Sequence, residues 1–171
     1  SLEMAATTMG DGQLSFAYEE GNHVPALVAG DQGRIRQVLI NLLGNAVKFT
    51  EHGQVKIRLD VDQTTPLGHK LRFTISDTGA GIPPDQLSTL FQPFIQADSA
   101  VRARYQGTGL GLSICKNLVE MMGGKIQATS DLGNGSQFSI TLDLHRAFEF
   151  NQNSPPAPDG SIQVLPANAR V

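Results

Sequence analysis

Apolar residues alternate with polar or small ones in several short segments of the chain. This period-two pattern predicts strands with one buried face. The clearest example is Leu14, Phe16 and Tyr18. The predicted strands cover residues 14–18, 26–29, 55–61, 71–77, 125–130 and 136–144. Pro66-Leu67-Gly68-His69 and the Gly-rich segment 131–135 separate consecutive strands, and both indicate hairpin turns.

A different period marks residues 32–49, where apolar side chains recur as they do on one face of a helix. Asp31 is placed to be the N-cap of this helix. The apolar face consists of Ile35, Val38, Leu39, Leu42, Leu43 and Ala46. Pro83-Pro84 favours a short helix over 85–91. A third helix is expected over 110–122, where Gly123-Gly124 would end it.

Hairpin-connected strands with helices grouped between them predict a two-layer α/β sandwich. Its sheet would be mixed, mostly antiparallel and covered on one face by helices. The length of 171 residues suits one domain, expected over 13–145. Residues 1–12 are small and polar, so we expect a flexible segment or a cloning remnant. Residues 146–171, rich in Pro, Asn and Ser, are predicted to be a linker.

Composition removes several classes of function. The formal net charge is −3 and no basic run is present, which argues against nucleic-acid binding. No apolar run approaches the roughly 20 residues that span a bilayer. The single cysteine, Cys115, lies at an apolar-rich helical position, and we interpret it as a small buried hydrophobe. No Cys/His spacing indicates a zinc site.

The helix over 32–49 also carries a polar stripe, which consists of Arg34, Gln37, Asn41, Asn45 and Lys48. A solvated face is the ordinary interpretation of such a stripe. However, asparagine is a mediocre helix former, and two of them stand one turn apart here. An amide oxygen is a hard ligand that suits Mg²⁺, and a lysine supplies a point charge for phosphate. The stripe is therefore a candidate site.

Two glycine-rich segments are the other candidates. Asp77-Thr78-Gly79-Ala80-Gly81 ends a strand in an acid that could accept a hydrogen bond from an exocyclic amine, with glycines that let backbone approach a flat ring. A plain turn is the alternative. The segment from Gly107 to Leu112 enters a helix and could form an anion cradle. It lacks the Gly-Lys-Ser/Thr of a Walker loop and the context of a dinucleotide fingerprint.

In this order, the three segments resemble the Bergerat-fold ATPase and kinase superfamily, and specifically the catalytic domain of sensor histidine kinases. Residues 41–50 (NLLGNAVKFT) match its asparagine box, and residues 77–81 match its first glycine box. Residues 91–94 (FQPF) match the phenylalanine box, and residues 107–112 match the second glycine box. The resemblance covers roughly residues 13–144.

The resemblance implies roles for individual residues. Asn45 would coordinate Mg²⁺ with help from Asn41, and Asp77 would read adenine. Lys48 and Arg104 would contact phosphates. The residues that it places around ATP are Asn41, Asn45, Lys48, Asp77, Gly79, Gly81, Ile82, Phe94, Arg104, Gly107, Thr108, Gly109, Leu110, Gly111 and Leu112. Residues 95–106 correspond to the ATP lid, which Phe91 and Phe94 would anchor unless they are simple core residues.

One position bears on the reaction. ATP-hydrolysing relatives carry a glutamate four residues before the metal-binding asparagine, and here that position is Asn41. Without a general base for water, the domain should hold ATP for another nucleophile. The alternatives are a hydrolysing Bergerat ATPase, a serine kinase of the anti-sigma type, and a degenerate kinase domain that acts only as a protein-interaction module.

The phosphoacceptor is expected outside this chain, because no histidine has the context of a phosphorylated one. The four histidines are His23, His52, His69 and His145. We therefore expect a separate dimerisation and phosphoacceptor domain in the parent protein. The tail resembles a linker into a receiver domain, which would make the parent a hybrid kinase that works with a response regulator. We expect a monomeric cytoplasmic fragment of a bacterial protein anchored in the inner membrane.

Overall fold

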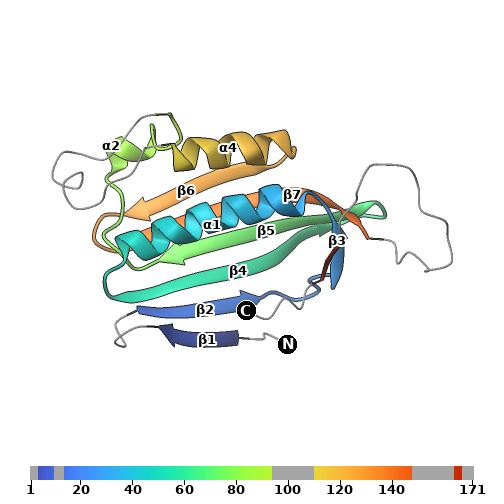
Figure 1. Cartoon of the computed structure of the whole chain (residues 1–171), viewed down its shortest axis with the longest axis horizontal. Helices are drawn as coiled ribbons and strands as arrows, with labels where there is room; N and C mark the ends of the chain where they lie inside the picture. The colour runs from blue at the N-terminus through green and yellow to red at the C-terminus, as the bar shows by residue number, and fades with distance from the viewer. Residues whose placement is uncertain (1–3, 10–13, 94–109, 148–163, 167–171) are drawn as a thin grey trace.

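The computed structural model describes residues 4–9, 14–93, 110–147 and 164–166 (Figure 1). The strands of this part of the chain form one eight-stranded sheet. They are β1 (Met4–Met9), β2 (Leu14–Glu20), β3 (Leu27–Ala29), β4 (Gly53–Thr64), β5 (Gly68–Asp77), β6 (Lys125–Asp131), β7 (Gly135–Arg146) and β8 (Val164–Pro166). The helices are α1 (Gln32–Phe49), α2 (Pro84–Leu87) and α4 (Gly111–Met121).

The sheet runs in the order β1-β2-β4-β5-β7, and the far edge of β7 is shared by two strands. β6 pairs with residues 135–141 of β7, and β3 pairs with residues 145–146. β8 then adds to the outer edge of β3. The β2–β4 pair is parallel and the other pairs are antiparallel. The sheet is therefore mixed and mostly antiparallel, as predicted.

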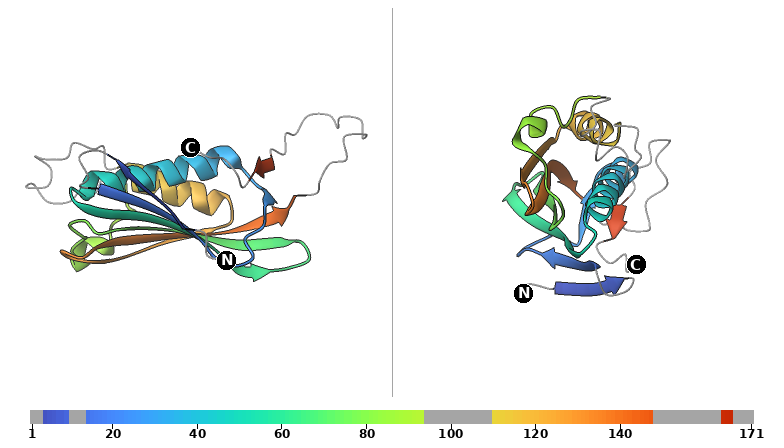
Figure 2. Two further views of the ribbon diagram at one scale, coloured as in Figure 1. Left: turned by 90° about the horizontal axis from the view of Figure 1, so that it is seen from below. Right: turned by 90° about the vertical axis from the view of Figure 1, so that its left-hand side faces the viewer.

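Helices α1 and α4 lie on the same face of this sheet (Figure 2). The register brings Ile75 of β5 opposite Phe138 of β7, and both side chains are buried beneath the helices. Leu42 of α1 is fully buried against this layer. The buried residues of α1 are Ile35, Val38, Leu42 and Ala46, and Leu39 and Leu43 pack at the margin of the core. The predicted two-layer α/β sandwich is confirmed.

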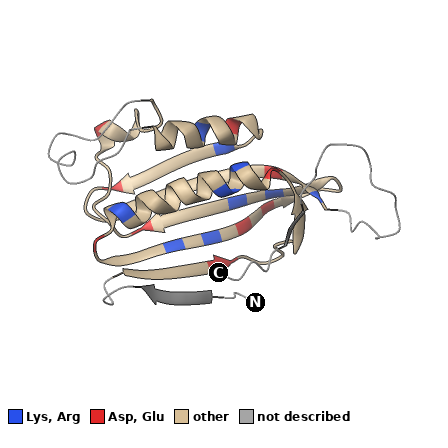
Figure 3. Ribbon diagram, in the orientation of Figure 1, with Lys and Arg blue, Asp and Glu red and all other residues tan. Residues whose placement is uncertain are grey.

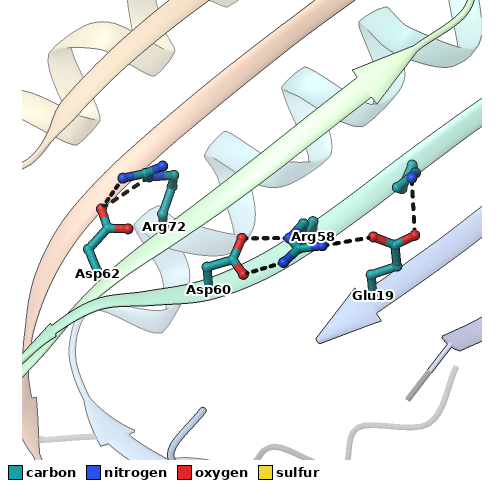
Figure 4. A network of polar contacts seen from close by, with 6 residues as sticks. Glu19, Arg58, Asp60, Asp62 and Arg72 are labelled. Carbon is teal, nitrogen blue, oxygen red and sulfur yellow. Dashed lines mark hydrogen bonds and ion pairs between the residues drawn. The ribbon is translucent and has the colours of Figure 1, made fainter. Parts of the chain in front are cut away.

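Charged residues of both signs follow one another along β4 (Figure 3), where Lys56, Arg58, Asp60 and Asp62 stand at alternate positions. Glu19 of β2 accepts hydrogen bonds from Lys56 at 3.0 Å and from Arg58 at 3.3 Å. Arg58 also forms a two-bond ion pair with Asp60 (Figure 4). A similar pair joins Arg72 of β5 to Asp62 of β4. These residues alternate with the buried side chains, so the ion pairs line the uncovered face.

Three local predictions differ from the structure. The expected flexible segment over 1–12 contains β1, because the edge of β2 offers backbone groups that another strand can pair with. The expected linker over 146–171 contains β8, which pairs with β3 for the same reason. The helix predicted over 85–91 ends at Leu87, and the chain continues in turns whose N–H groups bond three residues back.

Candidate functional site

The segments singled out in the sequence meet at one end of the helix-covered face. The C-terminus of α1, the end of β5, the β6–β7 turn, α2 and the start of α4 all lie at this end (Figure 1). The loop 78–82, which follows β5, lies between α1 and the β6–β7 turn and makes backbone hydrogen bonds to both. We call this segment the β5 loop.

The first anchor of the β5 loop is formed by the C-terminus of α1 and the start of β4. The hydroxyl of Thr78 accepts a hydrogen bond from the Gln54 N–H at 2.9 Å, and the Thr78 N–H donates to the Gln54 carbonyl at 3.1 Å. The N–H of Ala80 donates to the carbonyl of Phe49 at 3.3 Å. The bond between Ala80 and Phe49 places the end of the asparagine-rich helix against the loop that follows Asp77.

The second anchor is the β6–β7 turn. The Gly133 N–H donates to the Ala80 carbonyl at 2.8 Å. The hydroxyl of Ser130 accepts a hydrogen bond from the Ile82 N–H at 2.8 Å and donates to the Gly135 carbonyl at 2.6 Å. Ser130 thus joins three segments, and the sequence analysis missed it. Its position could have identified it. In β6, Ser130 follows Ile126 and Ala128 at alternate positions, so it lies on the side of the strand that faces the core.

These contacts explain why the β5 loop has glycines at positions 79 and 81, which the sequence alone did not show. A Cβ at Gly79 would lie 2.2 Å from the Phe49 carbonyl oxygen. A Cβ at Gly81, whose φ is +70°, would lie 2.2 Å from the Asp131 carbonyl oxygen. Both positions are therefore filled by the protein's own backbone. Their predicted contact with a flat ring remains a prediction.

Asp77, the last residue of β5, is held in one orientation. It is 8% exposed, and its Oδ1 atom accepts a hydrogen bond from the Gly79 N–H at 2.9 Å. Gly135 lies so close to it that a Cβ there would be 1.9 Å from the Asp77 carbonyl oxygen. The backbone is thus fixed from the β7 side while the carboxylate keeps one oxygen for another partner.

The residues of the polar stripe of α1 differ in their contacts and in their distance from the β5 loop. Asn41 accepts a hydrogen bond from Gln37 at 3.3 Å, so its amide is engaged within the helix. Asn45 and Lys48 are half-buried and lie further towards the end that faces the β5 loop. The Lys48 ammonium is 5.3 Å from the centre of the Phe49 ring. Phe49 is 38% exposed, and the sequence analysis did not single it out as an aromatic surface beside the β5 loop.

α4 begins at the same end. Leu110 precedes it without a side-chain cap, and its carbonyl accepts hydrogen bonds from the Ser113 hydroxyl and the Ile114 N–H. A Cβ at Gly111 would meet no described atom within 4 Å.

Further along α4, Cys115 is buried against α1, as expected for a small hydrophobe. Burial raises the pKa of its thiol, and a hydrogen bond with Asn41 opposes that shift.

Part of the predicted site lies outside the described residues. This applies to Phe94, Arg104, Gly107, Thr108, Gly109 and the lid over 95–106. Within the described ranges, no three His, Cys, Asp or Glu side chains are grouped so that they could hold a metal ion. No helix in those ranges has the length and apolar character needed to cross a membrane.

With this geometry established, the comparisons with known proteins identify the family. Residues 30–146 match the family described as histidine kinase-, DNA gyrase B- and HSP90-like ATPases. The chain belongs to this family. The predicted Bergerat fold and the predicted family are thereby confirmed.

Curated relatives place the chain among the histidine kinases of the family. The hybrid signal transduction histidine kinase B of Dictyostelium discoideum is 47% identical over 120 residues, which cover 70% of this chain and 6% of that protein. The sensory/regulatory protein RpfC of Xanthomonas campestris pv. campestris is 41% identical over 155 residues, which cover 90% of this chain and 21% of that protein. This histidine kinase domain thus spans a small part of the relatives it matches.

Solved structures agree with this placement. Full-length ShkA in complex with AMPPNP has a TM-score of 0.65 and 35% identity, over 78% of this chain and 26% of that one. The catalytic domain of histidine kinase ThkA has a TM-score of 0.60 and 33% identity, over 76% of this chain and 78% of that one.

The predicted bacterial source is not confirmed by family membership, because one relative comes from Dictyostelium discoideum.

Proposed function

We propose that this domain binds ATP and Mg²⁺ and presents the γ-phosphate to a histidine on a separate dimerisation and phosphoacceptor domain of the same parent protein. The observation that carries the proposal is the meeting of Asp77, the Asn45/Lys48 end of α1 and the start of α4 at one end of a histidine kinase fold. The ShkA relative, solved with AMPPNP, supports a nucleotide at such a site.

The adenine base would lie beside the β5 loop. The Asp77 carboxylate uses one oxygen for the Gly79 N–H, which leaves the other to accept a hydrogen bond from the exocyclic amine. The Phe49 ring is 38% exposed, and the Phe49 carbonyl accepts a hydrogen bond from the Ala80 N–H of this loop. Its ring offers a flat surface on which a base could stack.

The donor set of α1 fits a magnesium nucleotide. Mg²⁺ keeps several waters and commonly binds through one or two protein oxygens together with substrate phosphates. Asn45 supplies an amide oxygen for such a shell, and no described carboxylate cluster competes with it. Lys48, one turn away, would neutralise phosphate charge. When bound, the ion would screen the charge of the phosphate chain, and the residues of α1 would orient it.

The site favours phosphotransfer over hydrolysis. Asn41 occupies the position at which hydrolysing relatives carry a glutamate, and its amide is bonded to Gln37. A neutral amide cannot take a proton from water. Catalysis by this domain would therefore consist mainly of positioning and charge neutralisation, with the nucleophile supplied by the partner domain. A receiver domain of the parent protein and a response regulator are further proposed partners, because one of the relatives is named a hybrid histidine kinase.

Nucleotide binding is tested by calorimetry with AMPPNP, with and without Mg²⁺. We expect Asn45→Ala to abolish most of the Mg²⁺-dependent gain in affinity. Asn117→Ala is the matched control, because Asn117 is an exposed asparagine on α4. An unchanged Mg²⁺ dependence in Asn45→Ala would show that the metal assignment is wrong. Absence of AMPPNP binding by the wild-type chain would favour a protein-interaction module.

Phosphotransfer is tested by mixing the chain with a separately purified phosphoacceptor domain and labelled ATP. We expect acid-labile phosphohistidine on the acceptor and none on this chain when it is incubated alone. Rapid steady-state release of inorganic phosphate by the chain alone would instead indicate an ATPase. Stable phosphorylation of the isolated chain would also contradict the proposal.

A further inference from the structure

Ser130, the penultimate residue of β6, has a hydroxyl that is bonded towards both ends of the β5 loop. It accepts a hydrogen bond from the N–H of Ile82, the last residue of the loop, at 2.8 Å. It donates to the carbonyl of Gly135 at 2.6 Å. Gly135 in turn lies directly against Asp77, the residue that precedes the loop, because a Cβ there would be 1.9 Å from the Asp77 carbonyl oxygen. One hydroxyl thus connects the end of the loop with its beginning.

Two other contacts between the β6–β7 turn and the loop are made by backbone atoms. The Gly133 N–H donates to the Ala80 carbonyl at 2.8 Å. Gly81 packs against the Asp131 carbonyl, where a Cβ would be 2.2 Å from the oxygen. A change of side chain in the turn leaves both contacts in place. The Ser130 bonds depend instead on a single side-chain oxygen, so they can be removed without rebuilding the turn.

The Ser130 hydroxyl has no proton left to donate to a ligand. A serine hydroxyl carries one O–H donor, and here the Gly135 carbonyl accepts it. The oxygen also accepts the Ile82 N–H, and the residue is half-buried. Ser130 is therefore not placed to recognise a nucleotide itself. What it determines is the spacing of Asp77 and Ile82, the two residues that bound the loop.

We propose that Ser130 is a positioning residue of the nucleotide site, and that it holds the β5 loop in its binding geometry before the nucleotide arrives. This inference rests on the proposed function, in which the base lies beside the loop and meets Asp77. A loop that is ordered in advance loses less conformational freedom on binding, so it raises affinity. Ser130 bonds to the loop and to β7, whereas Asn45 and Lys48, proposed to bind Mg²⁺ and phosphate, belong to α1.

This division predicts how loss of the hydroxyl should affect the reaction. In Ser130→Ala, the Ile82 N–H loses its acceptor, and the loop is free to leave the geometry that fits the base. Binding of ATP should weaken, whereas the transfer step should keep its rate once the site is filled, because the phosphates are oriented from α1. A change of this kind raises KM and leaves kcat unchanged. A hydroxyl that only stabilises the fold would change neither value at a temperature where the variant is folded.

The test compares Ser130→Ala with Ser130→Thr, which keeps the hydroxyl, and with Thr129→Ala, which changes an exposed neighbour on β6. AMPPNP affinity is measured by calorimetry with Mg²⁺, below the melting transition of each variant as recorded by circular dichroism. KM and kcat come from phosphotransfer to the separately purified phosphoacceptor domain.

We expect Ser130→Ala to lose AMPPNP affinity about three- to tenfold, the effect of one hydrogen bond, with a matching rise in KM for ATP. The affinity and KM of Ser130→Thr and Thr129→Ala should stay within about twofold of the wild type, and so should the kcat of all three variants. If the wild-type chain neither binds AMPPNP nor transfers phosphate, the proposed function fails. If it does both, and Ser130→Ala keeps the wild-type affinity and KM, lowers kcat instead, or behaves like Ser130→Thr, only the positioning role of Ser130 is overturned.

Amide hydrogen exchange of the wild-type chain, followed by NMR, gives a second test that does not depend on how well a variant folds. We expect the Ile82 amide to be as protected in the free chain as in the complex with AMPPNP, because its acceptor is already in place. An Ile82 amide that exchanges freely until AMPPNP is added would show that the nucleotide, and not Ser130, orders the loop.

Discussion

Removal of the Ser130 hydroxyl should loosen the β5 loop and destabilise the fold. In Ser130→Ala, the Ile82 N–H loses its acceptor at 2.8 Å and the Gly135 carbonyl loses a donor at 2.6 Å. A hydrogen bond contributes about 1 kcal/mol net, and a buried group left without a partner costs about 1–3 kcal/mol. Because Ile82 is half-buried, we take the lower part of that range. The expected loss is about 2 kcal/mol in the free energy of unfolding.

The assay is equilibrium unfolding in urea, followed by circular dichroism. A loss of this size should lower the transition midpoint without a change in slope. It should also lower the melting temperature by roughly 6 °C for a domain of this size. Thr129→Ala is the control, because Thr129 is the preceding residue of β6 and is exposed. If Ser130→Ala unfolds within about 0.5 kcal/mol of the control, the loop is not held as we describe.

Three further predictions concern other parts of the fold. Gly133→Ala should lower the free energy of unfolding by ~1 kcal/mol, because its backbone is left-handed. Gly135→Ala should lower it by well over that amount, because only this change places a Cβ 1.9 Å from a carbonyl oxygen. Equal losses of the two variants in urea unfolding would contradict this. Cys115 should resist iodoacetamide at pH 8 until the chain unfolds, because burial raises its pKa; labelling of the native protein would be the opposite result. The hydrogen bond from Lys56 lowers the pKa of Glu19 below its ordinary 4.5, so the stability that this carboxylate adds is present above pH 4.5 and is lost as pH falls through the lower folded value. In urea unfolding from pH 7 to pH 3, the free energy of unfolding of Glu19→Gln should fall less steeply than that of the wild type. Parallel pH profiles of the two proteins would argue against a stabilising role of the Glu19 carboxylate.

Local signals predicted α1 well. The expected bounds, 32–49, are those observed, and Asp31 caps the helix by accepting a hydrogen bond from the Arg34 N–H at 3.0 Å. The buried face was also predicted, since an apolar repeat of 3.6 residues leaves one side of a helix to be covered. Both signals, the N-cap and the apolar repeat, act within a few residues, so they can be recognised without knowing which other segments pack against the helix. The family motifs are equally local, and the family match agrees with them.

Strand pairing could not be predicted in the same way. The period-two pattern located β2, β4, β5 and β7, but it does not say which strands are neighbours. The parallel pairing of β2 with β4, and the division of one edge of β7 between β6 and β3, join residues far apart in the chain. The additions of β1 and β8 depend on free strand edges, which a sequence pattern does not display.

By itself, then, the sequence determined helices α1 and α4, the strands from β2 to β7 and the family, because cap residues, periodicity and contiguous motifs are properties of neighbours along the chain. Only the tertiary structure decided what surrounds the Asp77 segment. It showed that Gly79 accommodates the α1 carbonyl and that Ser130 binds the loop from 48 residues away. Such facts depend on distances between segments brought together by folding, and no local pattern encodes them.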